Sequence, residues 1–434
     1  MMENHSFDNY FGVLAGSSDG LTLDGNGEPI ETNAGSGNRN VRMHPAVSTK
    51  QTGGVPTQSW NASHIQYADG ACDGFVRSIE QTLPGKDADT AMTYWNEHDL
   101  PFYYSLARTF PLATRWFSSC LGPTFPNRRF LIAGTAHGLI DDLPFGMADY
   151  PEAGTIFDLL TAHGISWANY HHLSPMRLNI NSLLRARGIG FIRTIGALLS
   201  GLLPQLRQYV QSKLQATATL YPLGFLATTN HLQSIDDFWS AAKSGQLPAV
   251  SIVDPDFGSC SEENPQDIQA GEGFAAKVIN AVMQGKGWPD TLLIWLYDEH
   301  GGYYDHVPPP SAPQPDGVRG ENPMNRFPLS RLLRLTVYGK EIEAADSGPS
   351  AYDRLGFRVP AVVVSPYAKA NYVSSQIYDH TAILRLIERK WNLPSLTKRD
   401  AAASDFADDV LDLDNRPQFL QPPTLAAPAQ PWRG

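Results

Sequence analysis

The feature that most restricts the fold of this sequence is the apolar run at 291–297 (TLLIWLY), which lies between a Trp-Pro-Asp turn at 288–290 and a Gly-Gly pair at 301–302. The run has no helical period, and it predicts a strand that is buried on both faces of a parallel sheet. Asp298 and Glu299 follow directly. Ligands of open α/β sheets bind beyond the carboxyl ends of strands. An isolated Asp-Glu pair would more often just end a strand in solvent, but together with the motifs described below the pair predicts a functional site here.

Composition narrows the class of protein. A chain of 434 residues allows one large α/β domain or two smaller ones. A net charge of -11 argues against a nucleic-acid partner, because phosphate backbones bind basic surfaces. No apolar run approaches the ~20 residues that a transmembrane segment needs. Cys72, Cys120 and Cys260 lack metal-ligand spacing, so we expect three buried thiols, with one disulfide and one thiol as the alternative.

Several further segments have strand or helix patterns. Apolar runs predict strands at 165–170, 248–253, 335–338 and 359–364. Helical spacing predicts helices at 155–163, 275–283 and 381–391. Residues 99–135 also have a helical pattern, which prolines interrupt. Strands that alternate with helices predict a three-layer α/β/α sandwich with a mostly parallel central sheet.

We expect one domain over residues 1–434 with three irregular parts. Residues 13–60 are rich in Gly, Asn and Ser and predict a long surface lip. Residues 176–236 carry leucines at helical spacing, which predicts a helical cap. The alternative is an amphipathic lid that transiently contacts a lipid surface. The scarcity of Lys in this segment argues against that alternative. Residues 415–434 contain five prolines and predict a strapped or loose tail.

Thr124 stands where a nucleophile could be activated. Pro126 precedes the apolar run 130–133, and proline favours the first turn of a helix. Thr124 would then lie at a helix N-terminus, where unpaired N–H groups and the helix dipole attract an anion. Taken alone, a Thr at this position would be an N-cap. Coordination to a metal ion is one way to make its hydroxyl nucleophilic.

Oxygen ligands for such an ion are present at both ends of the chain. Glu3, Asp298 and Glu299 offer hard anionic oxygens, and Asn4 offers a neutral one. This set suits one divalent ion, with Ca²⁺, Mg²⁺, Mn²⁺ and Zn²⁺ all left open. Adjacent residues of a strand point to opposite faces, so Glu3 and Asn4 must sit at a turning strand end. We therefore expect a buried strand to precede Glu3, and we expect that the N-terminus lacks this first strand.

Three long motifs carry a resemblance to a known family. Residues 3–12 (ENHSFDNYFG), 122–128 (GPTFPNR) and 297–310 (YDEHGGYYDHVPPP) resemble motifs of the bacterial phosphoesterase family, and residues 73–76 and 379–381 also match. That family contains phospholipases C and acid phosphatases within the alkaline-phosphatase-like superfamily. The resemblance runs from about residue 3 to 391 and implies an alkaline-phosphatase-like fold.

The resemblance also implies roles for individual residues. Thr124 would be the covalent nucleophile beside a metal ion. Asn4 and Arg128 would contact the phosphate. Three histidines, His64, His171 and His172, would contact phosphate oxygens or protonate the leaving group. For His64 and His171 the alternative is an ordinary structural hydrogen bond. Supporting positions are implied for His300, His306 and His380, and His5 is discounted.

Two departures from the family pattern stand out. The first strand is missing, and Asn264 occupies a place where many members have a His. Asn264 could bind phosphate but could not act as a general acid. The expected activity is hydrolysis of a small-molecule or lipid phosphate ester, first as a phospholipase C and second as a phosphomonoesterase; an inactive or truncated relative is the third alternative. Members are often exported, but residues 1–10 show no signal core, so the compartment stays open.

Overall fold

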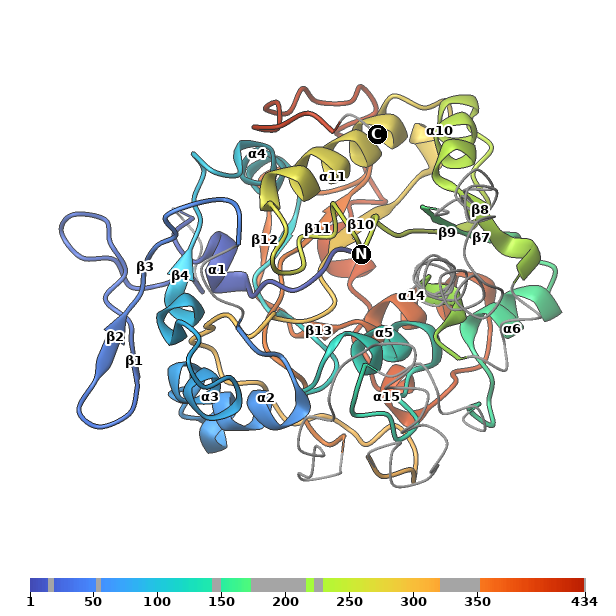
Figure 1. Cartoon of the computed structure of the whole chain (residues 1–434). Coiled ribbons are helices and arrows are strands. Elements are labelled where there is room, and N and C mark those ends of the chain that lie inside the picture. The colour runs from blue at the N-terminus through green and yellow to red at the C-terminus, as the bar shows by residue number, and fades with distance from the viewer. Residues whose placement is uncertain are drawn as a thin grey trace, which may run out of the picture.

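The computed structural model describes residues 1–14, 19–51, 56–142, 150–172, 216–221, 229–320 and 352–432. The predicted strand at 335–338 and most of the predicted cap at 176–236 lie outside the described residues. Within the described ranges the chain has a mixed α/β architecture (Figure 1).

Two sheets form the centre of the molecule. The first has the order β10 (Leu293–Leu296), β11 (Ala361–Val364), β5 (Leu112–Ala113) and β12 (Val373–Ser374), and it mixes antiparallel and parallel pairs. The second is parallel throughout, with the order β8 (Leu232–Ser234), β7 (Trp167–His171) and β9 (Val250–Val253). The prediction of one mostly parallel sheet is therefore not confirmed for these residues, whose sheets are small and mixed. The strand at 291–297 is confirmed as β10, but its partner β11 runs antiparallel to it.

Short strand pairs lie outside these two sheets. Inside the predicted lip, β1 (Thr32–Ala34) and β2 (Asn40–Arg42) form a hairpin, which projects from the body in Figure 1. The other pairs are β3 (His44–Pro45) with β4 (Thr93–Tyr94), and β6 (Trp116–Phe117) with β13 (Tyr378–Asp379). The lip is thus partly regular, and β5 and β6 interrupt the region 99–135 that we predicted as helical.

Helices pack on both sides of the strands in the view of Figure 1, with α10 and α11 on one side and α5, α6 and α14 on the other. Two apolar clusters correspond to these sides, one built on α11 and the other on α5, α6 and α14. The α-helices are α1 (Phe7–Phe11), α2 (Trp60–Tyr67), α3 (Phe75–Thr82), α4 (Pro101–Thr109), α5 (Thr124–Ala133), α6 (Ile156–Ala162), α10 (Ile235–Ser244), α11 (Ile268–Met283), α14 (Thr381–Trp391), α15 (Lys398–Ala401) and α16 (Ala407–Val410).

The bounds predicted from sequence spacing agree with the structure for some helices and differ for others. Helix α14 has the predicted bounds, because its apolar residues recur at a clear helical period. Helix α11 begins seven residues before the predicted start at 275, since Asp267 caps it by accepting a hydrogen bond from the backbone N–H of Gln269. The predicted cap also ends too late, because residues 232–234 form β8 of the parallel sheet.

The proline-rich tail is strapped to the body over its described residues. The backbone N–H of Phe419 donates to the carbonyl of Pro366, and the Trp288 indole donates to the carbonyl of Phe419. The ring of Trp432 packs 5.5 Å from that of Phe274 in α11. Cys72, Cys120 and Cys260 are buried free thiols, as predicted.

Gly301 lets the loop after β10 pass against the N-terminal segment. Its φ of +66° is left-handed, and a Cβ there would lie 2.0 Å from the carbonyl oxygen of Asn4. We expect Gly301→Ala to lower the free energy of unfolding by at least about 2 kcal/mol, since both backbone strain and a steric clash result. Gly317→Ala is the matched control, because a Cβ at Gly317 meets nothing within 4 Å. Urea denaturation measures both; equal stability of the two variants would contradict the close approach.

Candidate active site

The N-terminal residues lie against the end of β10, and this brings two of the predicted motifs together. Met2 forms a parallel bridge with Tyr297, and its carbonyl accepts from the backbone N–H of Asp298 at 3.2 Å. The next residue, Glu3, therefore lies beside Asp298. All four predicted metal ligands are at most 5 % exposed: Glu3, Asn4, Asp298 and Glu299. A solvent-exposed role for Asp298 and Glu299 is excluded by this burial.

Arg128 of α5 joins these carboxylates to a further one. Its Nε donates to Asp298 Oδ2 at 2.8 Å, and its Nη1 donates to Asp254 Oδ1 at 3.2 Å. Its Nη2 lies 3.5 Å from Glu3 Oε1. The Arg128 side chain is 1 % exposed. In the structure Arg128 is the buried counter-ion of the carboxylates, because a charge in the interior needs a partner. Its predicted contact with the phosphate remains a prediction.

Thr124 is the first residue of α5, one helical turn before Arg128. Pro123 takes the N-cap position, so the Thr124 hydroxyl is not the cap. The following backbone N–H, of Phe125, donates to the carboxylate of Asp142 at 2.8 Å. Burial raises the pKa of Asp142 to about 8. Since Asp298 binds Arg128 on the same helix, the structure brings the 122–128 and 297–310 motifs to one place.

Three oxygens of the predicted ligand set are buried without a hydrogen-bond partner: Glu3 Oε2, Asn4 Oδ1 and Glu299 Oε1. Burial, and then the Glu263 carboxylate, raise the pKa of Glu3 well above its usual range. Burial, and then the Asp298 carboxylate, do the same to the pKa of Glu299. Unpaired buried acceptors are costly in a folded protein, so these oxygens call for a cation or a proton.

The donor chemistry therefore fits a hard divalent ion, with one restriction. Across the described ranges, no three His, Cys, Asp or Glu side chains are grouped closely enough to hold a metal. Asp298 is also engaged, since Oδ2 accepts from Arg128 and Oδ1 accepts from the backbone N–H of Glu299. An ion here would thus need the amide oxygen of Asn4 together with Glu3 and Glu299, as hard oxygen ligands for such ions commonly combine.

Buried histidines support the loop after β10, as we expected. His380 Nε2 hydrogen-bonds the carbonyl of Asp298 at 2.7 Å, and His300 Nε2 hydrogen-bonds Gln66 Oε1 at 2.7 Å. Burial lowers the pKa of His300 to about 3. His306 Nδ1 lies 2.7 Å from Asp8 Oδ2. Neutral imidazoles such as that of His300 orient neighbouring groups rather than carry charge.

The three histidines with predicted catalytic roles lie in different surroundings. His172 packs against Phe274 and Trp432, and burial lowers its pKa. His171 is the last residue of β7 and directly precedes His172, so the two side chains point to opposite sides. His171 shares its face of the strand with Asn169, whose amide donates to Asp254. His171 is therefore better placed than His172 relative to the Arg128 carboxylates.

His64 lies on α2 and hydrogen-bonds the carbonyl of Trp60 through Nδ1 at 2.7 Å. The ring of Trp60 packs so tightly on Gly122 that a Cβ there would lie 2.9 Å from it. This contact places α2 beside the loop that precedes Thr124. Burial lowers the pKa of His64, so the neutral form predominates near pH 7.

Asn264 is half-buried, and its amide donates to the Tyr303 hydroxyl at 3.3 Å. The same hydroxyl donates to Gln51 Oε1 at 2.6 Å. Asn264 therefore takes part in a side-chain network with Tyr303, and its predicted phosphate contact remains a prediction.

Sequence analysis missed three residues at this site, Asp254, Thr217 and Glu262. Asp254 directly follows β9, as Asp298 follows β10, so the rule applied to Asp298 would also have found it. Thr217 donates to Asp254 through both its hydroxyl and its backbone N–H. Nothing in the local sequence links Thr217 to Asp254, because the contact depends on how the chain folds back.

Glu262 is the third missed residue. Its carboxylate accepts hydrogen bonds from three tyrosine hydroxyls, those of Tyr10, Tyr103 and Tyr297. The preceding carbonyl, of Ser261, accepts from the backbone N–H of Glu3 at 2.9 Å. Glu262 thus fixes the loop that holds the N-terminal motif in place.

The pH dependence of stability provides a test of Glu262. Burial raises its pKa to about 8 from an ordinary 4.5, so the folded state binds this proton more tightly than the unfolded state. Its contribution to stability is complete below pH 4.5 and is lost as the pH rises towards 8. We expect Glu262→Gln to flatten the fall of unfolding free energy between pH 5 and 8, by at most about 1.4 kcal/mol per pH unit. Urea denaturation at several pH values measures this; an unchanged slope would show that Glu262 does not titrate in this range.

In the part of the chain that the structure describes, no helix combines the length and apolarity that a bilayer crossing requires.

Comparison with known proteins identifies the family of this chain. The sequence model of the Phosphoesterase family matches residues 1–394. Non-specific phospholipase C6 of Arabidopsis thaliana is 29 % identical over 359 residues, which are 78 % of this chain and 56 % of that protein. Phospholipase C A of Mycobacterium tuberculosis is 28 % identical over 99 % of this chain and 78 % of its own length. Hemolytic phospholipase C of Pseudomonas aeruginosa is 26 % identical over 91 % of this chain and 52 % of its own length. The chain thus spans little more than half of some relatives, and the extent of the family match shows that it belongs to the Phosphoesterase family.

Proposed function

We propose that this protein is a metal-dependent phosphoric ester hydrolase that cleaves phosphodiesters in the manner of a phospholipase C. The observation that carries the proposal is that Arg128, one helical turn after Thr124 on α5, contacts Glu3 and Asp298. Their chain neighbours Asn4 and Glu299, together with Glu3, carry buried oxygens without a hydrogen-bond partner. The names of the relatives support the choice of substrate class.

The reaction would proceed in two displacements at phosphorus. The Thr124 oxygen forms a bond to phosphorus, the bond to the leaving alcohol breaks, and the hydroxyl proton of Thr124 is passed on. Water then attacks the phospho-threonine and restores the hydroxyl. A divalent cation bound by Glu3, Asn4 and Glu299 would favour the alkoxide of Thr124 and offset charge on the phosphoryl oxygens.

Proton transfer to the leaving alcohol needs a separate group. We assign it to His171, because His171 shares a strand face with Asn169, whose partner Asp254 binds Arg128. His172 lies on the opposite face among aromatic rings. His64, beside the Thr124 loop, is the second candidate.

Comparison of two chromogenic esters tests the proposal. We expect p-nitrophenyl phosphorylcholine to be hydrolysed with at least about tenfold higher kcat/KM than p-nitrophenyl phosphate. A reversed preference would favour the second candidate, a phosphomonoesterase. We also expect dialysis against EDTA to abolish activity and added divalent ions to restore it, since the alkoxide would lose its stabilising charge. Full activity after chelation, with metal content verified by elemental analysis, would exclude the metal-dependent route.

A further inference from the structure

Four aromatic rings gather where α10, α11 and the C-terminal tail meet. The ring centroids of Trp239 in α10 and Trp432 in the tail lie 5.8 Å apart. Phe274 of α11 packs on both, at 6.5 Å from Trp239 and 5.5 Å from Trp432. The ring of His172, just past β7, lies 5.8 Å from Phe274 and 5.6 Å from Trp432. We call these four rings the aromatic cage.

A cation already occupies the aromatic cage. Lys277 of α11 places its Nζ over two indole rings, 4.6 Å from the centroid of Trp239 and 4.2 Å from that of Trp432. Across the described ranges, no carboxylate forms an ion pair with this ammonium group. The ring faces carry negative potential, so the two indoles hold the cation by themselves. The Lys277 side chain as a whole is exposed.

The charges around the cage also favour a cation. Burial lowers the pKa of His172, the carboxylates of Asp256 and Asp236 act in the opposite direction, and Lys277 acts in the same direction as burial. Both carboxylates therefore lie close enough to His172 to act on the cage. The net charge of -11 adds to this bias, because it raises the local concentration of small cations.

The tail segment that carries Trp432 is fixed on α11. A Cβ at Gly273 would lie 2.2 Å from the carbonyl oxygen of Gln430, so the tail crosses the helix in close contact. The backbone N–H of Ala429 donates to the carboxylate of Glu272 at 3.0 Å. In Figure 1 the tail runs beside α11, with α10 near its end. The Trp432 ring is thus held in place before any ligand arrives, which lowers the entropic cost of binding.

We propose that the aromatic cage is a binding site for a quaternary ammonium group, and that the Lys277 side chain is its removable occupant. A lysine ammonium is strongly hydrated and loses hydrogen bonds to water against an aromatic face. A quaternary ammonium group has no N–H to leave unpaired, and aromatic cages recognise such groups. Lys277 is exposed and flexible, so it can swing into solvent. This inference does not rest on the proposed function.

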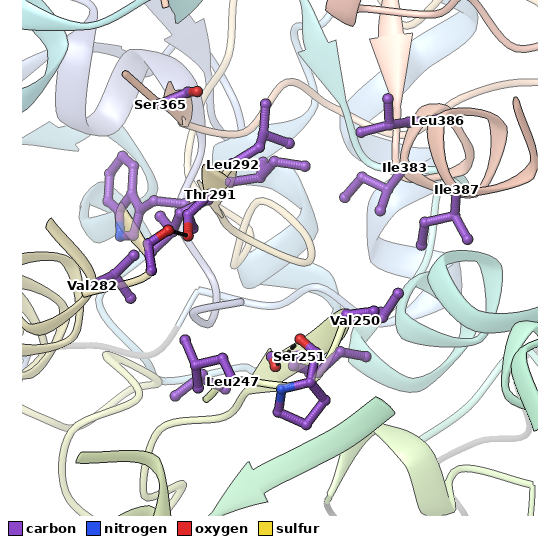
Figure 2. Close-up of a pocket in the computed structure, with 18 of the residues that line it drawn as sticks. Leu247, Val250, Ser251, Val282, Thr291, Leu292, Ser365, Ile383, Leu386 and Ile387 are labelled. Atoms are coloured by element: carbon purple, nitrogen blue, oxygen red, sulfur yellow. Dashed lines mark hydrogen bonds between the residues drawn. The ribbon is translucent and has the colours of Figure 1, made fainter. Parts of the chain in front are cut away.

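An apolar cavity elsewhere in the molecule must be distinguished from the cage. It has a volume of about 890 Å³, lies between β9 and β10, and is lined by residues that include Val282 and Ile383 (Figure 2). Apolar walls accept a neutral molecule better than a cation. Choline and its neutral isostere 3,3-dimethylbutan-1-ol are therefore a matched pair of probes, because the cage should prefer choline and the cavity should prefer the alcohol.

Titrations followed by saturation-transfer NMR of the probe methyl groups test the proposal. We expect choline to bind with a Kd on the order of 1 mM, and the alcohol to bind at least about fivefold more weakly. Trp432→Leu keeps apolar bulk but removes the ring face, so it should weaken choline binding at least about fivefold, and Trp432→Phe should weaken it less. A preference for the alcohol, or unchanged choline binding by Trp432→Leu, would overturn the proposal.

Lys277→Gln provides the second test, at an exposed position that does not endanger the fold. The variant removes the competing occupant, so we expect choline to bind about threefold more tightly or better. Lys286→Gln is the matched control, because it removes the same charge from an exposed lysine beyond the end of α11. Equal gains in both variants would show an effect of net charge alone, and weaker binding by Lys277→Gln would show a structural role; either result overturns the proposal.

The source of the quaternary ammonium group is distinguished with vesicles. Thr124→Ala, with and without Lys277→Gln, is sedimented with phosphatidylcholine or phosphatidylglycerol vesicles. Retention by phosphatidylcholine alone, increased by Lys277→Gln, identifies a lipid headgroup as the ligand. Choline binding without retention identifies a free quaternary ammonium compound. Neither measurement needs turnover, so failure of the proposed hydrolysis leaves both results readable.

Discussion

Thr124→Ala is expected to lower kcat by at least about 10³-fold, because the variant has no oxygen with which to form the phospho-enzyme. The hydroxyl does not cap α5, and the Phe125 N–H keeps its hydrogen bond to Asp142. The fold should therefore persist, with a Tm within a few degrees of the parent. Steady-state hydrolysis of p-nitrophenyl phosphorylcholine measures the effect.

Thr124→Ser is the matched control for this experiment. Serine keeps the nucleophilic oxygen, so we expect most of the activity to remain, within about 100-fold of the parent. Acid quenching with a radiolabelled ester should trap label on the parent and on the Ser variant, but not on the Ala variant. Near-parental turnover by Thr124→Ala would rule out a covalent threonine route and leave direct attack by water.

The largest effect on stability is expected from Arg128→Met. The substitution removes the cation from the interior but leaves Asp254 and Asp298, both fully buried, without their charged partner. Loss of one member of a buried ion pair costs about 3–5 kcal/mol, since the remaining charge is neither hydrated nor paired. Methionine keeps much of the volume, so the loss reports on charge rather than on packing. Chemical denaturation at neutral pH measures it.

Arg108→Met is the matched control for Arg128. Arg108 pairs with Glu97 on the surface, and both side chains are about half exposed, at 47 % and 56 %. Exposed ion pairs contribute little, so the free energy of unfolding should change by about 0.5 kcal/mol or less. If both Arg variants were equally stable, the carboxylates around Arg128 would have to be protonated in the folded state.

Local sequence patterns predicted the positions of the strand and helix near the site. They did not predict how the strands are arranged in the sheet. The apolar run at 291–297 became β10, and residues 381–391 became α14. Strand direction was not predictable in the same way, because β11 pairs with β10 antiparallel over a sequence separation of more than 60 residues. Apolar runs indicate burial on both faces but carry no information about the direction of the neighbouring strand.

Some polar and charged residues of the site were identified from the sequence, whereas the role of Arg128 became clear only from the structure. Glu3, Asn4, Asp298 and Glu299 were identified from residue type and motif, and the fold brings the two pairs together through the Met2–Tyr297 bridge. The role of Arg128 depended on Asp254, which is 126 residues away in sequence. Its guanidinium could have met a phosphate or a carboxylate, and only the packing of α5 against the ends of β9 and β10 selected the carboxylates.

The sequence by itself determined the chemical groups of this protein and the family to which it belongs, because motif spacing and side-chain type are local properties. Only the tertiary structure decided that His172 turns into an aromatic cluster while His171 takes the opposite strand face. It alone showed that β9 and β10 are edge strands of their sheets and that both line an apolar cavity. Such features arise from contacts between distant segments, whose free energy depends on burial and pairing in three dimensions rather than on neighbours along the chain.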